Sequence, residues 1–226
     1  MDPLSLFESD EITTREGPLK IFFLGHASLI FFFRDLKVYI DPYSDVADFS
    51  SLPKANIILI THEHGDHFDR PAIEKIINNQ TQIVLNENSA EKMGSGNVLH
   101  NGDEIILNGL KIQAVPAYNR VHKRANGQFY HPQGTGNGYV ITFGDKKVYA
   151  AGDTENIPEM KDLQNIDCAF LPMNLPYTMT PQMVAEAASD FRPKILYPYH
   201  YGETEMEPLI TLMKKVKGVE LRIKRL

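Results

Sequence analysis

The chain has 226 residues, of which 42% are hydrophobic and 23% charged, and these fractions are ordinary for a soluble globular protein. Its formal net charge of −6 argues against general nucleic-acid binding, which usually relies on a basic face. No apolar run approaches the roughly 18 residues that a membrane-spanning helix needs, and residues 1–15 are too polar and acidic for a signal peptide. We therefore expect a cytoplasmic protein without a membrane span, although a leader trimmed from the chain would leave the same sequence.

The length predicts one domain, residues 1–226, built from two fused αβ halves at roughly 1–108 and 109–226. The single cysteine, Cys168, lies in an apolar run and is expected to be a buried structural thiol. One cysteine cannot build a thiolate-based metal site. Any metal must therefore be held by imidazole and carboxylate groups.

The first half begins with apolar, β-prone runs separated by turn residues, which indicates a strand meander. Residues 55–61 then form a continuous apolar run that ends at a group of histidines, as is typical of a strand buried on both faces. Ile73, Ile76 and Ile77 have helical spacing, with Asp69 as a start signal. The expected strands are residues 19–24, 29–33, 37–40, 55–61 and 82–85, and the expected helices are residues 71–78 and 89–93.

The second half repeats this order of elements. Gly144 and Asp145 read as a hairpin turn between two strands, and Thr180 and Pro181 read as the cap and first residue of a helix that runs to about residue 190. The expected strands are residues 104–107, 110–115, 138–143, 146–151, 168–171 and 194–199, and a last helix is expected at residues 205–217. The pattern predicts an α/β fold of four layers, with two mixed sheets packed face to face and helices outside.

A long polar stretch without predicted structure separates two of these strands, at residues 116–138. It carries four glycines and several basic and histidine side chains. A loop of this length inside a compact domain is often functional, and the alternative is a disordered surface excursion.

The strongest chemical signal is the cluster of His62, His64, Asp66 and His67, directly after a predicted buried strand. In an extended segment residues i and i+2 point to the same side, so His62 and His64 can hold one cation. Gly65 would permit a sharp change of direction. Asp66 and His67 would then face a second cation beside the first.

Two further candidates, Asp153 and His200, also follow predicted buried strands. Polar groups at the carboxyl ends of such strands gather at one edge of a layered α/β protein, where active sites commonly lie. Alone, Asp153 could be a turn or helix-cap aspartate and His200 a satisfied strand-end histidine. Together with the histidine cluster, both are predicted metal ligands.

The chain resembles the metallo-β-lactamase-fold hydrolase superfamily, whose His-x-His-x-Asp-His motif stands here at residues 62–67. Within it, the chain is most similar to the branch that contains ascorbate-6-phosphate lactonase-like proteins and N-acyl-phosphatidylethanolamine phospholipase D. The supporting segments are Gly-His-Ala-Ser at 25–28, Asp-Pro at 41–42, Tyr-Ala-Ala-Gly-Asp-Thr at 149–154 and Pro-Tyr-His-Tyr-Gly at 198–202.

This resemblance implies an αβ/βα metallo-β-lactamase sandwich with metals at the edge between the sheets. It implies two divalent metal ions, with His62 and His64 on the first, Asp66, His67 and His200 on the second, and Asp153 bridging them. We expect zinc, with manganese, iron or nickel as alternatives. His26 either supports these ligands from outside or simply ends a strand.

The chain departs from the family pattern at the third ligand of the first metal. A histidine usually follows the next strand there, where this chain has Asn119. Asn119 could be a weak ligand, His131 or His122 could enter from the long loop, or the first site could be poorly occupied. His131 is favoured over His122 because Pro132 restricts the chain beside it. Both histidines could also be surface residues.

The function expected from these features is hydrolysis of an ester, lactone or related bond in a small anionic substrate by a metal-bound hydroxide. Asp66 would orient that nucleophile and accept its proton. The substrate-binding residues are not identified. The candidates are Arg120, Lys123 or Arg124 for charge neutralisation and Tyr118 or Tyr177 for hydrogen bonding.

Two alternatives remain open. One is a phosphodiesterase for lipid or nucleotide headgroups, with Phe129, Tyr130 and Met179 available to line its site. The other is a non-catalytic metal-binding protein on the same fold, which only the asparagine at position 119 suggests. The expected partner is a small-molecule substrate and not nucleic acid, and the sequence does not indicate an oligomeric state.

Overall fold

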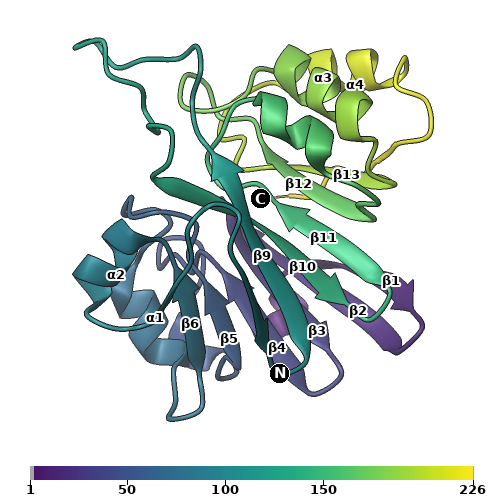
Figure 1. The fold of residues 1–226 in the computed structure, drawn as a ribbon. Coiled ribbons are helices and arrows are strands. Elements are labelled where there is room, and N and C mark those ends of the chain that lie inside the picture. The colour runs from purple at the N-terminus through teal and green to yellow at the C-terminus, as the bar shows by residue number, and fades with distance from the viewer. Residues whose placement is uncertain (1–2, 226) are drawn as a thin grey trace.

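The computed structural model describes residues 3–225, and two seven-stranded mixed sheets form its centre (Figure 1). Sheet A contains, in spatial order, β1 (Glu8–Thr14), β2 (Gly17–Gly25), β3 (Ser28–Phe33), β4 (Leu36–Ile40), β5 (Ile57–Leu59), β6 (Gln82–Leu85) and β7 (Asn97–Val98). Sheet B contains β8 (Glu104–Leu107), β9 (Leu110–Ala117), β10 (Gly136–Phe143), β11 (Lys146–Ala150), β12 (Cys168–Pro172), β13 (Ile195–Tyr199) and β14 (Glu220–Leu221).

Both sheets have the same internal plan. In sheet A, β1 to β4 pair antiparallel and β4 to β7 pair parallel. In sheet B, β8 to β11 pair antiparallel and β11 to β14 pair parallel. Parallel neighbours need a crossover, and the helices are found in these crossovers. They are α1 (Arg70–Ile76), α2 (Glu87–Met93), α3 (Pro181–Phe191) and α4 (Glu207–Met213), together with the 3-10 turns η2 (Phe49–Ser51) and η3 (Pro158–Asp162). A further 3-10 turn, η1 (Pro3–Leu6), precedes β1.

The core has three apolar layers. Between the sheets, Phe31 of sheet A lies 5.5 Å from Phe143 and 5.8 Å from Phe170 of sheet B, measured between ring centroids. A second layer lies between sheet B and the α3 side, and a third lies between sheet A and the α1 side. Figure 1 shows the helices on the outer faces. The predicted αβ/βα sandwich is therefore confirmed.

Several predicted ends are confirmed with their physical causes. The side chain of Asp69 accepts a hydrogen bond from the amide of Ala72 and begins α1, and Thr180 caps α3 through the amide of Met183. The expected strands at 82–85 and 104–107 coincide with β6 and β8. Cys168 is fully buried, as expected, and burial raises the pKa of its thiol to about 12.

Two expected elements are shorter in the structure, and the strand β1 is not among the expected elements. Residues 8–14 form the edge strand β1. Their sequence, Glu-Ser-Asp-Glu-Ile-Thr-Thr, has no apolar run, because an edge strand is largely exposed and only Ile12 and Thr14 are buried here. The helix expected at 205–217 is the shorter α4, which begins at Glu207 because Pro208 fits only a first turn. The strand expected at 55–61 is confined to β5.

The carboxyl ends of β4, β5, β11 and β13 lie at one edge of the sandwich, and non-glycine residues with left-handed backbone concentrate there. Among residues 3–225, seven non-glycine residues have positive φ, and His26 (54°), Asp41 (43°) and His200 (45°) are three of them. Such conformations persist where the surrounding structure enforces them, often at functional sites. None of the helices in residues 3–225 is long and apolar enough to cross a membrane.

Candidate metal centre

The loop after β5 brings four side chains of the first half together. The Nε2 atom of His62 lies 3.0 Å from Nδ1 of His64, and the Oδ2 atom of Asp66 lies 3.8 Å from Nε2 of His67. His62 and His67 are buried, whereas Asp66 is 37% exposed. The loop therefore presents two pairs of donor atoms at the sandwich edge.

Asp41, directly after β4, fixes the far side of this loop. Its carboxylate is fully buried and accepts hydrogen bonds from the amide and hydroxyl of Thr61, at 2.8 and 2.6 Å. The Nδ1 atom of His67 lies 2.8 Å from Oδ2 of Asp41. If Nδ1–H donates to this carboxylate, Nε2 carries the lone pair and can bind a metal. Asp41 has no predicted role at the site, because the Asp-Pro segment is its only signal in the sequence.

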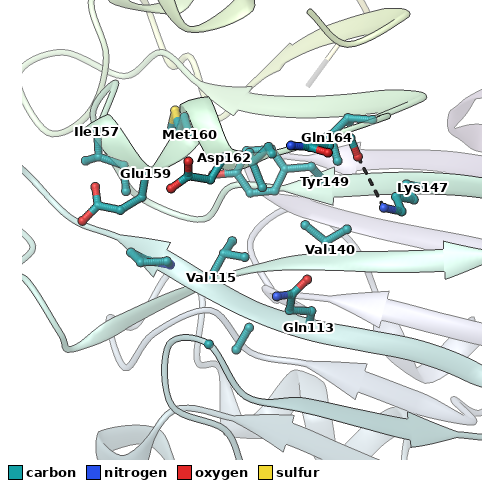
Figure 2. Close-up of a pocket in the computed structure, with 15 residues that line it drawn as sticks. Gln113, Val115, Val140, Lys147, Tyr149, Ile157, Glu159, Met160, Asp162 and Gln164 are labelled. Atoms are coloured by element: carbon teal, nitrogen blue, oxygen red, sulfur yellow. Dashed lines mark hydrogen bonds between the residues drawn. The ribbon is translucent and has the colours of Figure 1, made fainter. Parts of the chain in front are cut away.

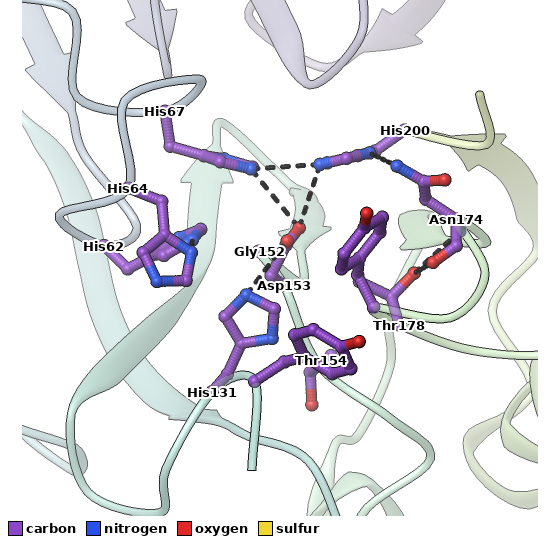
Figure 3. A network of polar contacts seen from close by, with 12 residues as sticks. His62, His64, His67, His131, Gly152, Asp153, Thr154, Asn174, Thr178 and His200 are labelled. Atoms are coloured by element: carbon purple, nitrogen blue, oxygen red, sulfur yellow. Dashed lines mark hydrogen bonds and ion pairs between the residues drawn. The ribbon is translucent and has the colours of Figure 1, made fainter. Parts of the chain in front are cut away.

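The second half supplies Asp153, His200 and His131 from three separate segments (Figure 3). Asp153 lies between the two groups of histidines: its Oδ2 is 3.2 Å from Nε2 of His131, and its Oδ1 is 3.4 Å from Nε2 of both His67 and His200. The Nε2 atoms of His67 and His200 are 3.1 Å apart. These residues come from the loops after β11 and β13 and from the long loop before β10.

The long loop is an ordered part of this edge, with both Asn119 and His131 buried. His131 approaches His62 and His64, with ring centroids 5.0 and 4.9 Å away. Asn119 contacts the opposite side of that ring, because its Oδ1 lies 2.7 Å from Nδ1 of His131. Among the alternatives for the third donor of the first group, the geometry therefore favours His131.

Within residues 3–225, potential donor atoms within 4.8 Å of one another form three overlapping groups. The groups are His62, His64 and His131; His62, His67 and Asp153; and His26, Asp66, His67 and His200. His26 belongs to the last group because its Nε2 lies 2.9 Å from Oδ2 of Asp66, and its ring packs against His200 at 3.7 Å between centroids. His26 therefore contacts the cluster directly.

The local charges favour neutral imidazoles on one side and positive charge on the other. Burial, reinforced by the nearby imidazole of His67, lowers the pKa of His62 well below its usual value. Burial would also lower the pKa of His67, but the carboxylates of Asp153 and Asp41 outweigh it and raise that pKa. Burial would raise the pKa of Asp66, but hydrogen bonds from His200 and His26 lower it, so Asp66 is ionised at neutral pH.

This donor set fits divalent cations. The Oδ1 atom of Asp153 is buried without a hydrogen-bond partner among residues 3–225, although a buried polar atom normally has one. The imidazole nitrogens of the facing pairs converge at 3.0–3.1 Å. A set of imidazoles and carboxylates without thiolates suits zinc, iron, nickel or manganese.

A cleft of about 430 Å³ opens beside the cluster and is lined by His64, Gly65, Asp66, Arg124, Tyr130, His131, Asp153, Asn174, Tyr177 and His200. Arg124 is the one cationic Lys or Arg side chain in this lining. Arg120 instead donates to the carbonyl of Asn156, and Lys123 lies over the ring of Phe129. Of the three basic candidates, the structure thus places Arg124 at the cleft.

Two other expected residues lie away from the cleft. The Nδ1 atom of His122 is 2.6 Å from the carboxylate of Glu155, and the hydroxyl of Tyr118 donates to Glu159. Gly65 lines the cleft, but it has no left-handed φ and an added Cβ would meet no atom within 4 Å. The backbone at position 65 therefore does not require glycine in order to turn.

A second cavity, of about 370 Å³, lies on the outer face of sheet B beneath η3 (Figure 2). Its lining includes Gln113, Lys147, Tyr149 and Glu159. None of the clustered histidines lines it, so this cavity is separate from the metal centre.

Comparisons with known proteins agree with this geometry. The sequence profile of the Beta-lactamase superfamily domain matches residues 20–200. A UPF0173 metal-dependent hydrolase of Nanoarchaeum equitans is 32% identical over 191 residues, which cover 81% of this chain and 84% of that protein.

Solved structures have the same fold. A Parabacteroides distasonis protein, provisionally named a metal-dependent hydrolase, matches with 50% identity and a TM-score of 0.93 over 97% of this chain and 99% of its own. Igni18, described as a metallo hydrolase of Ignicoccus hospitalis, shares the fold at 23% identity and a TM-score of 0.71, over 92% of this chain and 95% of its own. From the matched profile, the curated relative and the histidine and aspartate cluster, we conclude that the chain belongs to the β-lactamase superfamily as one of its UPF0173 metal-dependent hydrolases.

Proposed function

We propose that this hydrolase binds two divalent metal ions and cleaves an ester or lactone bond in a small anionic substrate. His62, His64 and His131 would hold the first ion, and Asp66, His67 and His200 the second. The observation that carries the proposal is the position of Asp153, whose two oxygens face the two groups of histidines. Zinc is the first choice of metal for these donors, with manganese, iron or nickel as alternatives.

The side chains have distinct tasks in such a reaction. Bound divalent cations would supply Lewis acidity and lower the pKa of a water molecule towards neutrality. Asp66 lines the cleft and is partly exposed, and its lowered pKa keeps it ionised, so that it can accept hydrogen bonds at neutral pH. It would orient the attacking water and receive its proton. His26, 2.9 Å from Asp66, would hold that carboxylate in place.

The preference for an anionic substrate rests on Arg124. This exposed guanidinium lies 5.1 Å from the ring centroid of Tyr130 and shares the cleft with the phenol of Tyr177. Arginine binds carboxylate and phosphate groups through paired N–H donors. Tyr177 would donate a hydrogen bond to the same substrate.

A phosphodiesterase is the second candidate function. A groove of about 850 Å³ adjoins the metal cleft through Asn174 and includes Leu175, Pro208 and Leu212. Tyr130 and Tyr177 also pack edge to face, 5.0 Å apart. An apolar groove suits a lipid chain and exposed aromatic rings suit a base. By contrast, the non-catalytic alternative loses its motivation, because His131 lies beside His62 and His64.

The test is an assay of the metal-reconstituted protein on matched panels of anionic and neutral lactones, carboxylic esters and phosphodiesters. We expect the fastest turnover with anionic esters or lactones, and Asp66→Ala should lower it by at least about 100-fold. Release of a phosphate monoester as the main product would favour the second candidate. Elemental analysis with anomalous diffraction should find two ions per chain. A single ion, or full activity in Asp66→Ala, would contradict the proposal.

A further inference from the structure

His131 is held in an unusual way for a ligand candidate, because it belongs to a loop instead of a strand end. The segment between β9 and β10 extends away from the body of the molecule in Figure 1 before it returns to the cluster. Two hydrogen bonds from main-chain amides tie its ends together: the amide of Asn119 donates to the carbonyl of His131, and the amide of His131 donates to the side-chain Oδ1 of Asn119, both at 2.8 Å.

Asn119 also determines which nitrogen of His131 can bind a metal. Its Nδ2 donates to the carbonyl of Tyr177 at 2.8 Å and to Oε1 of Glu155 at 3.1 Å. With both N–H groups used, the amide oxygen is left facing Nδ1 of His131 at 2.7 Å. That oxygen can only accept a hydrogen bond, so Nδ1 carries the proton and Nε2 presents its lone pair to the cluster.

Glu155 in turn holds the start of the loop. Its side chain is fully buried and accepts hydrogen bonds from the amides of Arg120, Val121 and His122, at 2.6, 2.7 and 2.7 Å. Burial would raise the pKa of Glu155, but these donors and the Asn119 amide lower it. A buried carboxylate with this many N–H donors fixes the backbone of the segment that it binds.

We propose that Glu155 and Asn119 form a positioning clamp that fixes the place and the tautomer of His131, and thereby sets the affinity of the first metal site. The inference rests on the proposed function, because it requires His131 to be a ligand. Neither residue reaches the cleft lining, so both act through His131. The clamp is also close in sequence to Asp153, whose carboxylate lies between the two groups of histidines, because Asp153 is two residues before Glu155.

The first experiment measures metal release from the full-length, zinc-loaded protein during titration with a chelator. Glu155→Gln should release one of its two zinc equivalents at about 10–100-fold lower chelator concentration than the unmodified chain, as is common for partners of metal ligands. The second equivalent should be unaffected. Glu159→Gln is the matched control, because Glu159 accepts from the hydroxyl of Tyr118 beside the clamp and contacts neither Asn119 nor His131 among the hydrogen bonds of residues 3–225. Equal weakening of both equivalents, or none, would overturn the inference.

Two further variants separate positioning from general stability. Asn119→Ala removes the acceptor for His131 but leaves Glu155 its three amide donors. It should therefore also weaken the binding of one zinc equivalent. This variant tests the clamp even if Glu155→Gln does not fold. The double variant Asn119→Ala with Glu155→Gln changes both members of the clamp. It should bind zinc about as weakly as the weaker single variant, because both residues act through His131. Additive losses would show that the two residues act independently and contradict the clamp.

His131→Ala distinguishes the two proposals. If it keeps both zinc equivalents at wild-type affinity, His131 is not a ligand, and the proposed metal assignment fails together with the clamp. If it loses one equivalent while Glu155→Gln and Asn119→Ala bind zinc like the unmodified chain, the metal assignment stands and only the clamp is wrong.

Discussion

The two halves of the molecule have the same order of antiparallel and parallel strands, but they contribute to the metal centre in different ways. The first half presents His62, His64, Asp66 and His67 from one short loop after β5. The second half presents His131, Asp153 and His200 from three segments that lie far apart in the sequence. One loop can be fixed by one buried partner, whereas three segments each need their own support.

The residues that hydrogen-bond to the ligand candidates differ between the halves in the same way. Asp41 contacts both Thr61 and His67 of the first loop. In the second half, Glu155 and Asn119 hold the loop of His131, and the amide of Asn174 lies 3.3 Å from Nδ1 of His200. Asp41 and Asp153 also follow corresponding strands, β4 and β11. Corresponding strands therefore supply a carboxylate to the site in both halves. Asp41 supports His67 from the side away from the cluster, whereas Asp153 lies between the two groups of histidines.

The largest effect should come from Asp153→Asn, which removes the charge that faces both histidine groups. We expect hydrolysis to fall to background and both metal equivalents to be weakened, because Oδ1 and Oδ2 lie near different groups. His64→Ala should weaken one equivalent only, since His64 belongs to one group. Metal content and turnover measured on both variants check this, and equal patterns would remove the distinction between the two residues.

Asp41→Asn tests the support of the first half. The variant loses the carboxylate that accepts from His67 and Thr61, so its affinity for the second metal should drop about 10–100-fold. Chelator titration followed by anomalous diffraction would show which ion leaves first. The comparison between the halves fails if Asp41→Asn releases the same ion as Glu155→Gln.

Glycines beside the ligands give a matched pair. An added Cβ at Gly152 would lie 2.9 Å from the carbonyl oxygen of Asn137 and 3.0 Å from Cβ of Thr61, and its φ is +65°. Gly152→Ala should therefore lower the free energy of unfolding by about 2 kcal/mol. Gly65→Ala should change it by less than about 0.5 kcal/mol, because its site is open. Denaturant titration measures both, and similar values would contradict this account.

Arg124→Ala should have the smallest effect. It should raise KM for anionic esters roughly tenfold, as expected for loss of a charged hydrogen bond at an exposed site. KM for neutral esters should stay the same. Lys123→Ala is the control, because that ammonium lies over Phe129 outside the cleft lining. An equal change with neutral esters would show that Arg124 does not act through charge.

The sequence predicts the fold well where local signals agree with the tertiary structure. The strand meander of the first half, the helix cap at Thr180 and the strand at residues 82–85 are all found in the structure as predicted. The sequence does not predict β1, because its polar residues form a strand through pairing with β2. Edge pairing of this kind depends on a neighbouring strand and leaves no hydrophobic pattern in the segment itself.

The candidate site shows the same limit. His62 to His67 are recognisable because adjacent residues carry the whole pattern, and Asp153 and His200 because strands precede them. The sequence does not decide which of Asn119, His122 and His131 is the third donor of the first group, because that depends on where the loop returns in space. Glu155 has no recognisable sequence signal, because one acidic residue does not show that three amides converge on it.

The division of ligand candidates between the halves has a consequence for assembly. The close approach of Gly152 to Thr61 joins the two halves at the site, and neither half presents all the donors on its own. The full cluster therefore forms where the two halves meet. Cations held by donors of both halves would stabilise that contact, and the gain in stability would rise with the logarithm of metal concentration.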